Sequence, residues 1–162
     1  MTEPKASRPH MPGYGILDAD KGNGLLPWSW ATDRLTRAHT YWVATVRPDG
    51  APHVMPVWGV WIGGRFYFGT DRRSTKGRNL AQQPAVVVHL ESGDDTVILE
   101  GVASQVTDAP LLSEIDNAYQ KKYGMRVVGH PGDTGIYCVS PKKVFAWREK
   151  DFPVSATRWQ CE

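Results

Sequence analysis

The sequence has few cysteines and no long apolar run, and each absence excludes a class of protein. Its 162 residues include two cysteines, Cys138 and Cys161, which fit neither a CxxC motif nor zinc-ligand spacing. We therefore expect two free thiols. No segment approaches the ~20 apolar residues that a membrane helix needs, and residues 1–12 lack the apolar stretch of a secretory signal. The sequence thus predicts a soluble, cytoplasmic protein without a membrane partner.

The charge also lacks a dominant sign. Nineteen basic and 17 acidic residues leave a net charge of +2, which is too small to predict nucleic-acid binding. The five histidines form no HExxH, and GxSxG, Walker A and GxGxxG motifs are missing. We therefore predict no metal site and assign no catalytic residue. Such a pattern fits a protein whose bound cofactor carries the chemistry.

The sequence does contain many short β-rich runs separated by turn residues. Pro48-Asp49-Gly50 and Gly63-Gly64 predict tight turns, and Gly101 within a long run predicts a bulge. Strands are expected at residues 41–46, 52–62, 65–69, 85–90, 96–106, 135–139 and 143–147, with a short last strand at 157–160.

Three helices are expected among these strands, at residues 29–38, 74–82 and 108–124. Ser29, Ser74 and Asp108 are their candidate N-caps. Hairpin-linked strands with few helices predict a mainly β fold, a small antiparallel barrel. Residues 1–24 are polar and rich in glycine and proline, so we expect a flexible N-terminal arm there and a single domain over residues 25–162.

The sharpest chemical feature is the segment 69–80, Gly-Thr-Asp-Arg-Arg-Ser-Thr-Lys-Gly-Arg-Asn-Leu, where a strand ends and a short helix begins. A helix N-terminus favours an anion through its unpaired N–H groups. Lysine and arginine add charge-assisted hydrogen bonds to phosphate. The segment therefore predicts a phosphate site, with a solvated basic turn, or a nucleic-acid surface, as the alternatives.

The order and spacing of several motifs resemble one known family. Residues 44–58 (ATVRPDGAPHVMPVW) and 65–68 (RFYF) are followed by S-x-K-x-x-N-L at 74–80, Gln-Pro at 83–84 and LEGVA at 99–103. This run is similar to the pyridoxamine-5'-phosphate-oxidase-like superfamily, and its S-x-K-x-x-N-L form is similar to the coenzyme-F420-dependent branch. FMN-binding relatives are the near rival. The resemblance implies a split antiparallel β-barrel that forms a homodimer, with cofactor sites at the subunit interface.

The resemblance also implies which residues bind the cofactor. Residues of the phosphate segment would hold the phosphate, residues of the second strand would lie along the ring, and the partner's last strands would close the site. The residues so predicted are Met55, Pro56, Val57, Trp58, Thr70, Ser74, Thr75, Lys76, Asn79, Trp147, Arg158 and Trp159. The N-terminal arm is longer than the family pattern and is expected to cover the pocket.

The function implied is an F420- or FMN-dependent oxidoreductase, preferably an F420H2-dependent reductase that transfers hydride to a small unsaturated or aromatic acceptor. His53 is a candidate proton donor. A non-catalytic protein that stores or delivers the cofactor is the alternative from another class. The fuller arginine-lysine phosphate pattern of true pyridoxamine phosphate oxidases is missing, which disfavours vitamin B6 oxidation.

Overall fold

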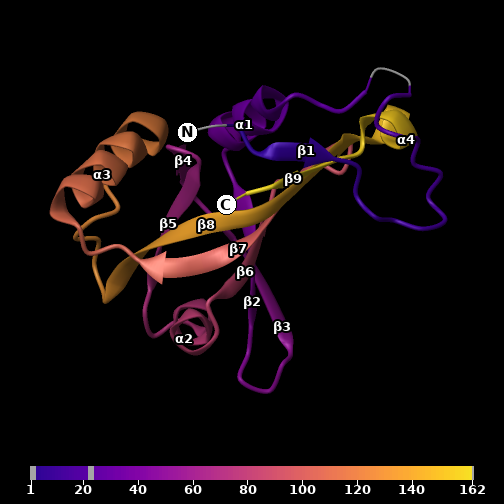
Figure 1. Cartoon of the computed structure of the whole chain (residues 1–162). Helices are drawn as coiled ribbons and strands as arrows, with labels where there is room; N and C mark the ends of the chain where they lie inside the picture. Colours follow the sequence, from indigo (N-terminus) through magenta and orange to yellow (C-terminus); the bar gives the residue numbers. More distant parts are fainter. Residues whose placement is uncertain (1–2, 22–23, 162) are drawn as a thin grey trace.

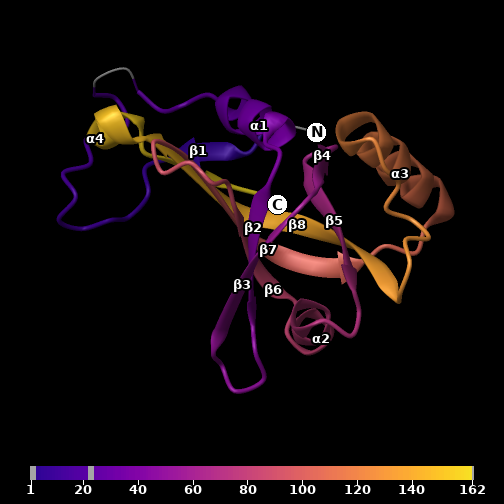
Figure 2. The same cartoon turned by 180° about the vertical axis from the view of Figure 1, so that it is seen from behind.

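The computed structural model describes residues 3–21 and 24–161. In this part of the chain, nine strands build one curved antiparallel sheet, and four α-helices lie around it (Figures 1 and 2). The strands are β1 (Lys5–Ser7), β2 (Tyr41–Val46), β3 (Pro52–Val57), β4 (Val60–Ile62), β5 (Arg65–Asp71), β6 (Ala85–His89), β7 (Asp95–Gln105), β8 (Thr134–Arg148) and β9 (Thr157–Gln160). The helices are α1 (Trp28–Arg37), α2 (Thr75–Gln82), α3 (Ala109–Tyr123) and α4 (Phe152–Ser155). The mainly β prediction is confirmed.

Pairing follows the order β1-β9-β8-β7-β6-β2-β3, and β5 joins β8 while also pairing with β4. β8 is long enough to hold β5 along its first half and β9 along its second half on the same edge. The inward face carries a core that includes Tyr41, Phe66, Phe68 and Val139, all fully buried. A second cluster around Ile115 and Tyr119 packs α3 against the opposite face of the sheet, where it meets Tyr67 of β5 and Cys138 of β8.

The expected strand over residues 52–62 is two strands in the structure. β3 pairs with β2, whereas β4 pairs with β5, and the chain crosses between them at Trp58 and Gly59. A Cβ on Gly59 would lie 2.3 Å from the ring of Phe66 and 2.8 Å from the Tyr67 carbonyl oxygen. The chain changes partner here because only glycine permits this close approach.

In the long strands β7 and β8, one prediction is confirmed and another differs from the structure. The register shifts between Glu100 and Gly101, which confirms the predicted bulge. A Cβ on Gly101 would meet the Ser140 carbonyl oxygen at 2.3 Å, so the bulge requires glycine. The two strands expected at 135–139 and 143–147 are one continuous strand, in which Pro141 pairs with Gly101 and Lys142 is the extra residue at the bulge.

The N-terminal arm contains a strand that the sequence analysis did not predict. β1 pairs with β9 through Lys5–Gln160, Ala6–Trp159 and Ser7–Arg158. After the arm, α1 begins at Trp28 with Pro27 as its N-cap, one residue before the expected start, and Ser29 lies inside the helix. The ring of Trp28 packs edge-on against Trp159, which ties α1 to the end of the sheet.

The other two predicted helix caps are confirmed. The Ser74 side chain accepts a hydrogen bond from the Gly77 amide, and the Asp108 side chain accepts one from the Leu111 amide. Gly124 ends α3 in the left-handed conformation. Of the helices in the described residues, none is long and apolar enough to cross a membrane.

Candidate functional site

A pocket of about 600 Å³ opens where the ends of β3 and β5 meet the start of α2 and the segment that follows α3. In Figure 1, α2 lies below the end of β5, and α3 lies at the left beside β4 and β5. Five of the predicted residues line it: Pro56, Val57, Trp58, Thr70 and Lys76. The other lining residues are Gly69, Asp71, Tyr119, Met125, Arg126, Val127, His130, Pro131 and Thr134.

Lys76 supplies positive charge to this pocket. Its side chain is only 8% exposed, and no hydrogen-bond or ion-pair partner for its ammonium group lies among residues 3–21 and 24–161. Burial lowers the pKa of Lys76 below its ordinary value, because the charged form loses water. The ammonium nitrogen is not among the fully buried unpaired atoms of the described residues, so it keeps some contact with solvent at the pocket. An anionic ligand at this point would accept a charge-assisted hydrogen bond from it.

The start of α2 presents further donors beside Lys76. The Ser74 hydroxyl is engaged in capping the Gly77 amide at 3.0 Å, and it lies 3.2 Å from the Thr70 hydroxyl. Thr75 and Lys76 occupy the first turn, where backbone N–H groups have no partner within the helix. The two half-buried hydroxyls and the free amides together form a cradle that suits phosphate oxygens.

The other basic residues of this segment are occupied or point to solvent. Arg72 pairs with Asp133 at 2.6 Å, and Arg73 pairs with Asp71 at 2.9 Å. The Arg73 guanidinium and its amide lower the pKa of Asp71 to about 2. Arg78 is exposed. The segment is therefore not a continuous basic patch, and its partnerless buried charge is Lys76.

Asn79 is turned away from the pocket. It is 3% exposed, and its amide donates a hydrogen bond to the Thr45 hydroxyl on β2 at 3.0 Å. This contact fastens α2 to the sheet. Asn79 therefore holds α2 in place on the sheet and does not line the pocket.

Two aromatic residues, Trp58 and Tyr119, also line the pocket. Trp58 is 42% exposed and stacks parallel on Tyr123, with ring centroids 4.6 Å apart and planes 1° apart. The Tyr123 hydroxyl lies 2.8 Å from the carbonyl oxygens of both His39 and Gly59 and donates its one proton to either, which fixes the stack. His39 also contacts the Trp58 ring, edge to face, with ring centroids 5.7 Å apart. The 42% of Trp58 that stays exposed is the surface it can offer to a planar ring. The neighbouring Met55, another predicted residue, is 46% exposed on β3 and does not line the pocket.

One wall of the pocket was not predicted from the sequence. It is formed by the segment 125–131, which follows α3. Asp116 of α3 holds this wall: its carboxylate accepts bonds from the Arg126 guanidinium at 2.6 Å and from the Val127 and Val128 amides at 2.9 and 3.0 Å. Burial alone would raise the pKa of Asp116, but these bonds outweigh burial and keep it below its ordinary value. The signal in the sequence was Asp116 itself, a carboxylate next to Ile115 that is buried on α3 together with Ile115 and Tyr119.

The three predicted C-terminal residues lie elsewhere in the protomer. Trp159 is 1% exposed and packed in the core, which leaves it no surface for a ligand. The ring of Trp147 packs edge-on against Phe152, and Arg158 donates to the Ser7 hydroxyl at 3.2 Å. The expected contact of Trp147 and Arg158 with a partner's cofactor stays a prediction.

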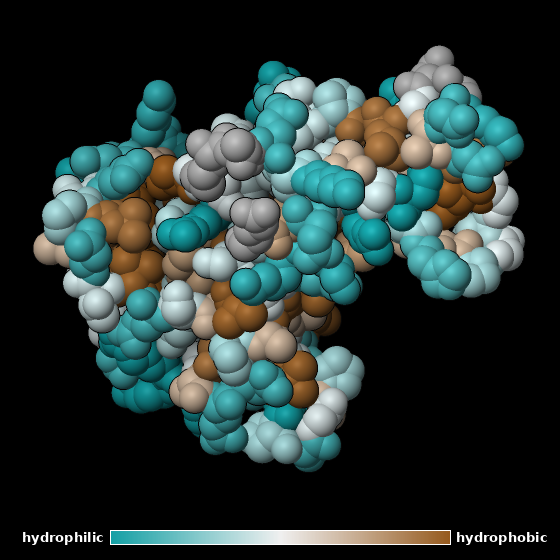
Figure 3. Space-filling model, in the orientation of Figure 1, coloured by the Kyte–Doolittle hydropathy of each residue, from teal (hydrophilic) through white to brown (hydrophobic). Residues whose placement is uncertain are grey.

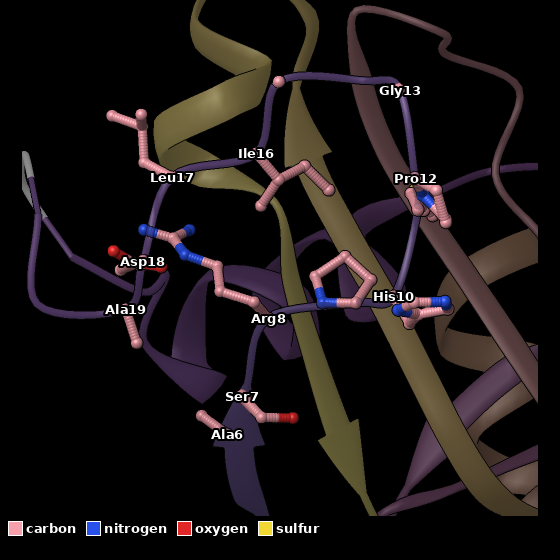
Figure 4. A pocket seen from close by; sticks show the side chains of 13 residues that line it. Ala6, Ser7, Arg8, His10, Pro12, Gly13, Ile16, Leu17, Asp18 and Ala19 are labelled. Carbon is pink, nitrogen blue, oxygen red and sulfur yellow. The ribbon is translucent and has the colours of Figure 1, made fainter.

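The N-terminal arm does not line this pocket but encloses a separate hollow of about 650 Å³ (Figure 4). The Arg8 guanidinium donates from one nitrogen to the carbonyls of Val154 and Ala156, at 2.5 and 2.8 Å. These bonds fasten the arm to α4 at the far end of the sheet. The predicted cover over the cofactor pocket is therefore not formed by the described part of the arm.

Comparison with known families agrees with this arrangement. A family profile described as "Pyridoxamine 5'-phosphate oxidase" matches residues 31–148. The chain belongs to this family. The match runs from α1 to the end of β8 and includes the whole pocket, whereas β1, the arm and β9 lie outside it. No curated protein matches the chain significantly in sequence.

Solved structures of proteins with different descriptions share this fold. A conserved hypothetical protein of Mycobacterium tuberculosis is 24% identical, with a TM-score of 0.67, over 76% of this chain and 85% of that one. A protein titled F420 reductase is 24% identical, with a TM-score of 0.60, over 74% and 98%. The haem storage protein HutZ of Vibrio cholerae is 20% identical, with a TM-score of 0.61, over 73% and 89%. These likenesses show the split-barrel fold.

Proposed function

We propose that this protein is an F420H2-dependent reductase that transfers hydride to a small unsaturated or aromatic acceptor. The observation that carries the proposal is Lys76, which is 8% exposed, has no partner for its ammonium group among the described residues, and lines the same pocket as Trp58 and Tyr119. A phosphate at Lys76 and a planar ring near Trp58 match the two ends of such a cofactor. The S-x-K-x-x-N-L motif at 74–80 favours the deazaflavin over FMN.

The protein's own residues bind and orient in this scheme. A reduced deazaflavin, when bound, supplies the hydride, and the acceptor takes its proton from water. Lys76 and the first turn of α2 hold the phosphate, while the Trp58–Tyr123 stack sets the position of the planar system. The wall fastened by Asp116 limits the space in which the acceptor lies.

A homodimer in the cytoplasm is part of the same proposal. β3 ends the sheet order, so its outer edge has no strand partner within the described chain. Val54 and Met55 on this strand are 49% and 46% exposed, and apolar surface is visible beside the β2–β3 hairpin in the lower part of Figure 3. An exposed apolar edge strand favours association, and a second copy would extend the walls of the pocket beside β3.

The test is the affinity of purified protein for F420, followed by tryptophan quenching, in two variants. Lys76→Ala is expected to weaken binding by about 1.5–3 kcal/mol, the scale of a hydrogen bond to a charged group. Arg78→Ala on the exposed face of the same helix is the matched control and is expected to leave the affinity unchanged. Equal affinities of wild type and Lys76→Ala would contradict the site.

A cofactor-storage protein would use the same cradle, so binding alone does not separate it from an enzyme. The separating observation is turnover: a reductase oxidises bound F420H2 when an acceptor is added, with loss of the reduced cofactor's spectrum. Binding of F420 without oxidation by any acceptor in a panel of quinones, nitroaromatics and enones would favour storage.

A further inference from the structure

The chain crosses from β3 to β4 at Trp58 and Gly59, and α3 supplies hydrogen bonds to this crossover. The two residues lie between the β2–β3 ladder, which ends at Val57, and the β4–β5 ladder, which begins at Val60. Backbone groups at such a point need partners outside the sheet. Three side chains near the end of α3 provide them, and we call these the α3 clamp: Tyr119, Lys122 and Tyr123.

The α3 clamp holds the peptide group that joins Trp58 to Gly59. Its members are spaced i, i+3 and i+4, so they share one face of the helix. The Tyr119 hydroxyl donates to the Trp58 carbonyl oxygen at 2.8 Å, and the Gly59 amide donates to the Tyr123 hydroxyl at 3.0 Å. The Lys122 ammonium group donates to the Gly59 carbonyl oxygen at 3.0 Å. Because Tyr123 also stacks on the Trp58 ring, α3 contacts both the backbone and the side chain of Trp58.

Lys122 joins the α3 clamp to the protein core. Its ammonium group also donates to the hydroxyl of the fully buried Tyr41 at 2.8 Å, and it lies 4.8 and 5.2 Å from the ring centroids of Tyr41 and Tyr123. In the part of the chain that the structure describes, no carboxylate pairs with Lys122. Burial lowers the pKa of Lys122 to about 8. A half-buried ammonium group without a counter-ion costs free energy, so stability alone does not account for a lysine here.

We propose that Lys122 is a positioning residue for Trp58: through the α3 clamp it fixes where the Trp58 ring lies, and thereby where the planar end of a bound cofactor lies. This inference rests on the proposed function for the identity of the ligand. Trp58 and Tyr119 line the pocket, whereas Lys122 does not, so Lys122 acts through them. The phosphate is held by Lys76 on another helix, α2, so anion binding there is expected to be independent of Lys122.

Lys122→Met tests the proposal, because methionine has a similar length and no donor. The two acceptors that lose Lys122 each keep another bond. The Gly59 carbonyl oxygen still has the Tyr123 hydroxyl at 2.8 Å, and the Tyr41 hydroxyl still donates to the Leu35 carbonyl oxygen. We therefore expect the variant to fold, which urea unfolding checks. Tyr123→Phe keeps the stacked ring, removes the hydroxyl and serves as the second variant of the α3 clamp.

The first measurement compares the two ends of the pocket. F420 affinity is expected to fall several-fold in Lys122→Met and in Tyr123→Phe. Inorganic sulfate, followed through the backbone amide NMR signals of Thr75 and Lys76, is expected to bind both variants as tightly as wild type. Lys121→Met, at the exposed neighbouring position on α3, is the matched control and is expected to leave both affinities unchanged.

The second measurement is a double-mutant cycle with Trp58→Ala. If Lys122 acts through Trp58, Lys122→Met has little further effect on F420 affinity once the Trp58 ring is absent. A purely structural role of Lys122 would weaken F420 binding by the same factor in both backgrounds.

The outcomes separate this inference from the proposed function. If wild type binds F420 while Lys122→Met and Tyr123→Phe bind it equally tightly, or if the losses from Lys122→Met and Trp58→Ala add fully, the role of Lys122 is overturned and the proposed function stands. A parallel loss of sulfate affinity in Lys122→Met would overturn it as well. If wild type binds neither F420 nor FMN, both proposals fail.

Discussion

At the level of single residues, two members of the S-x-K-x-x-N-L motif have different roles. Lys76 and Asn79 belong to one motif and are both buried. Lys76 lines the pocket and has no partner within the described part of the chain, whereas Asn79 bonds to Thr45. A buried polar group that is paired contributes stability, and one that is unpaired costs free energy until a ligand arrives. The hydrogen bonds that the two residues make therefore distinguish the structural role of Asn79 from the binding role of Lys76. Their shared motif does not make this distinction.

Asn79→Ala tests this separation. The change leaves the Thr45 hydroxyl without its donor in a buried place, so we expect the free energy of unfolding to fall by about 1–3 kcal/mol. F420 affinity of the folded variant is expected to change little. Urea unfolding and cofactor titration give the two numbers, and a large loss of affinity at unchanged stability would instead place Asn79 on the phosphate, as the family resemblance implies.

At the scale of elements, the cradle depends on how closely α2 packs on the end of β5. A Cβ on Gly77 would lie 2.5 Å from the Asp71 carbonyl oxygen and 2.7 Å from that of Arg72. These are backbone atoms, which cannot move aside as a flexible side chain can. The short distance between strand end and helix start is what brings Thr70 and Ser74 within 3.2 Å.

Gly77→Ala is therefore expected to destabilise the protein, although alanine is the better helix former by about 1 kcal/mol. The clash outweighs that gain, and thermal unfolding is expected to move down with a loss of about 1–3 kcal/mol. Gly93→Ala is the matched control, since a Cβ there meets nothing within 4 Å. Equal melting temperatures for Gly77→Ala and wild type would show that α2 can shift without cost.

The elements that could be predicted from the sequence are those that neighbouring residues along the chain determine. Turn residues marked the hairpins, Ser74 and Asp108 marked two helix starts, and Gly101 marked the bulge. It did not predict β1, because Lys5–Ser7 shows no apolar alternation and pairs with a strand at the other end of the chain. The break at Gly59 was hidden for a similar reason, since strand-forming residues flank it and its cause is the ring of Phe66.

The candidate site divides in the same way. Motifs with a fixed spacing predicted Thr70, Lys76 and the β3 residues as cofactor-binding residues. The pocket brings several of them together. The wall at 125–131 belongs to a connecting segment whose shape is set by one carboxylate on α3. The side chains that a loop presents depend on tertiary contacts, so periodicity carries no information about them.

At the scale of the whole molecule, the pocket is open beside the free edge of β3, where the proposed dimer would form. Light scattering after size-exclusion chromatography is expected to give twice the chain mass. Val54→Lys places a charge on the exposed apolar edge and is expected to shift the protein toward monomer and weaken cofactor binding. Tyr14→Ser, at an exposed aromatic on the arm, is the control. A wild-type monomer that binds cofactor fully would refute the shared site.

The proposed role of the pocket lined by Lys76 and Trp58 is to hold a deazaflavin. The most direct measurement is parallel titration of wild-type protein with F420, FMN and haemin, with Lys76→Ala as the reference. F420 is expected to bind most tightly, and its affinity is expected to fall in Lys76→Ala. Tighter binding of FMN would keep the site but change the cofactor, and binding of haemin alone, unaffected by Lys76→Ala, would contradict the claim.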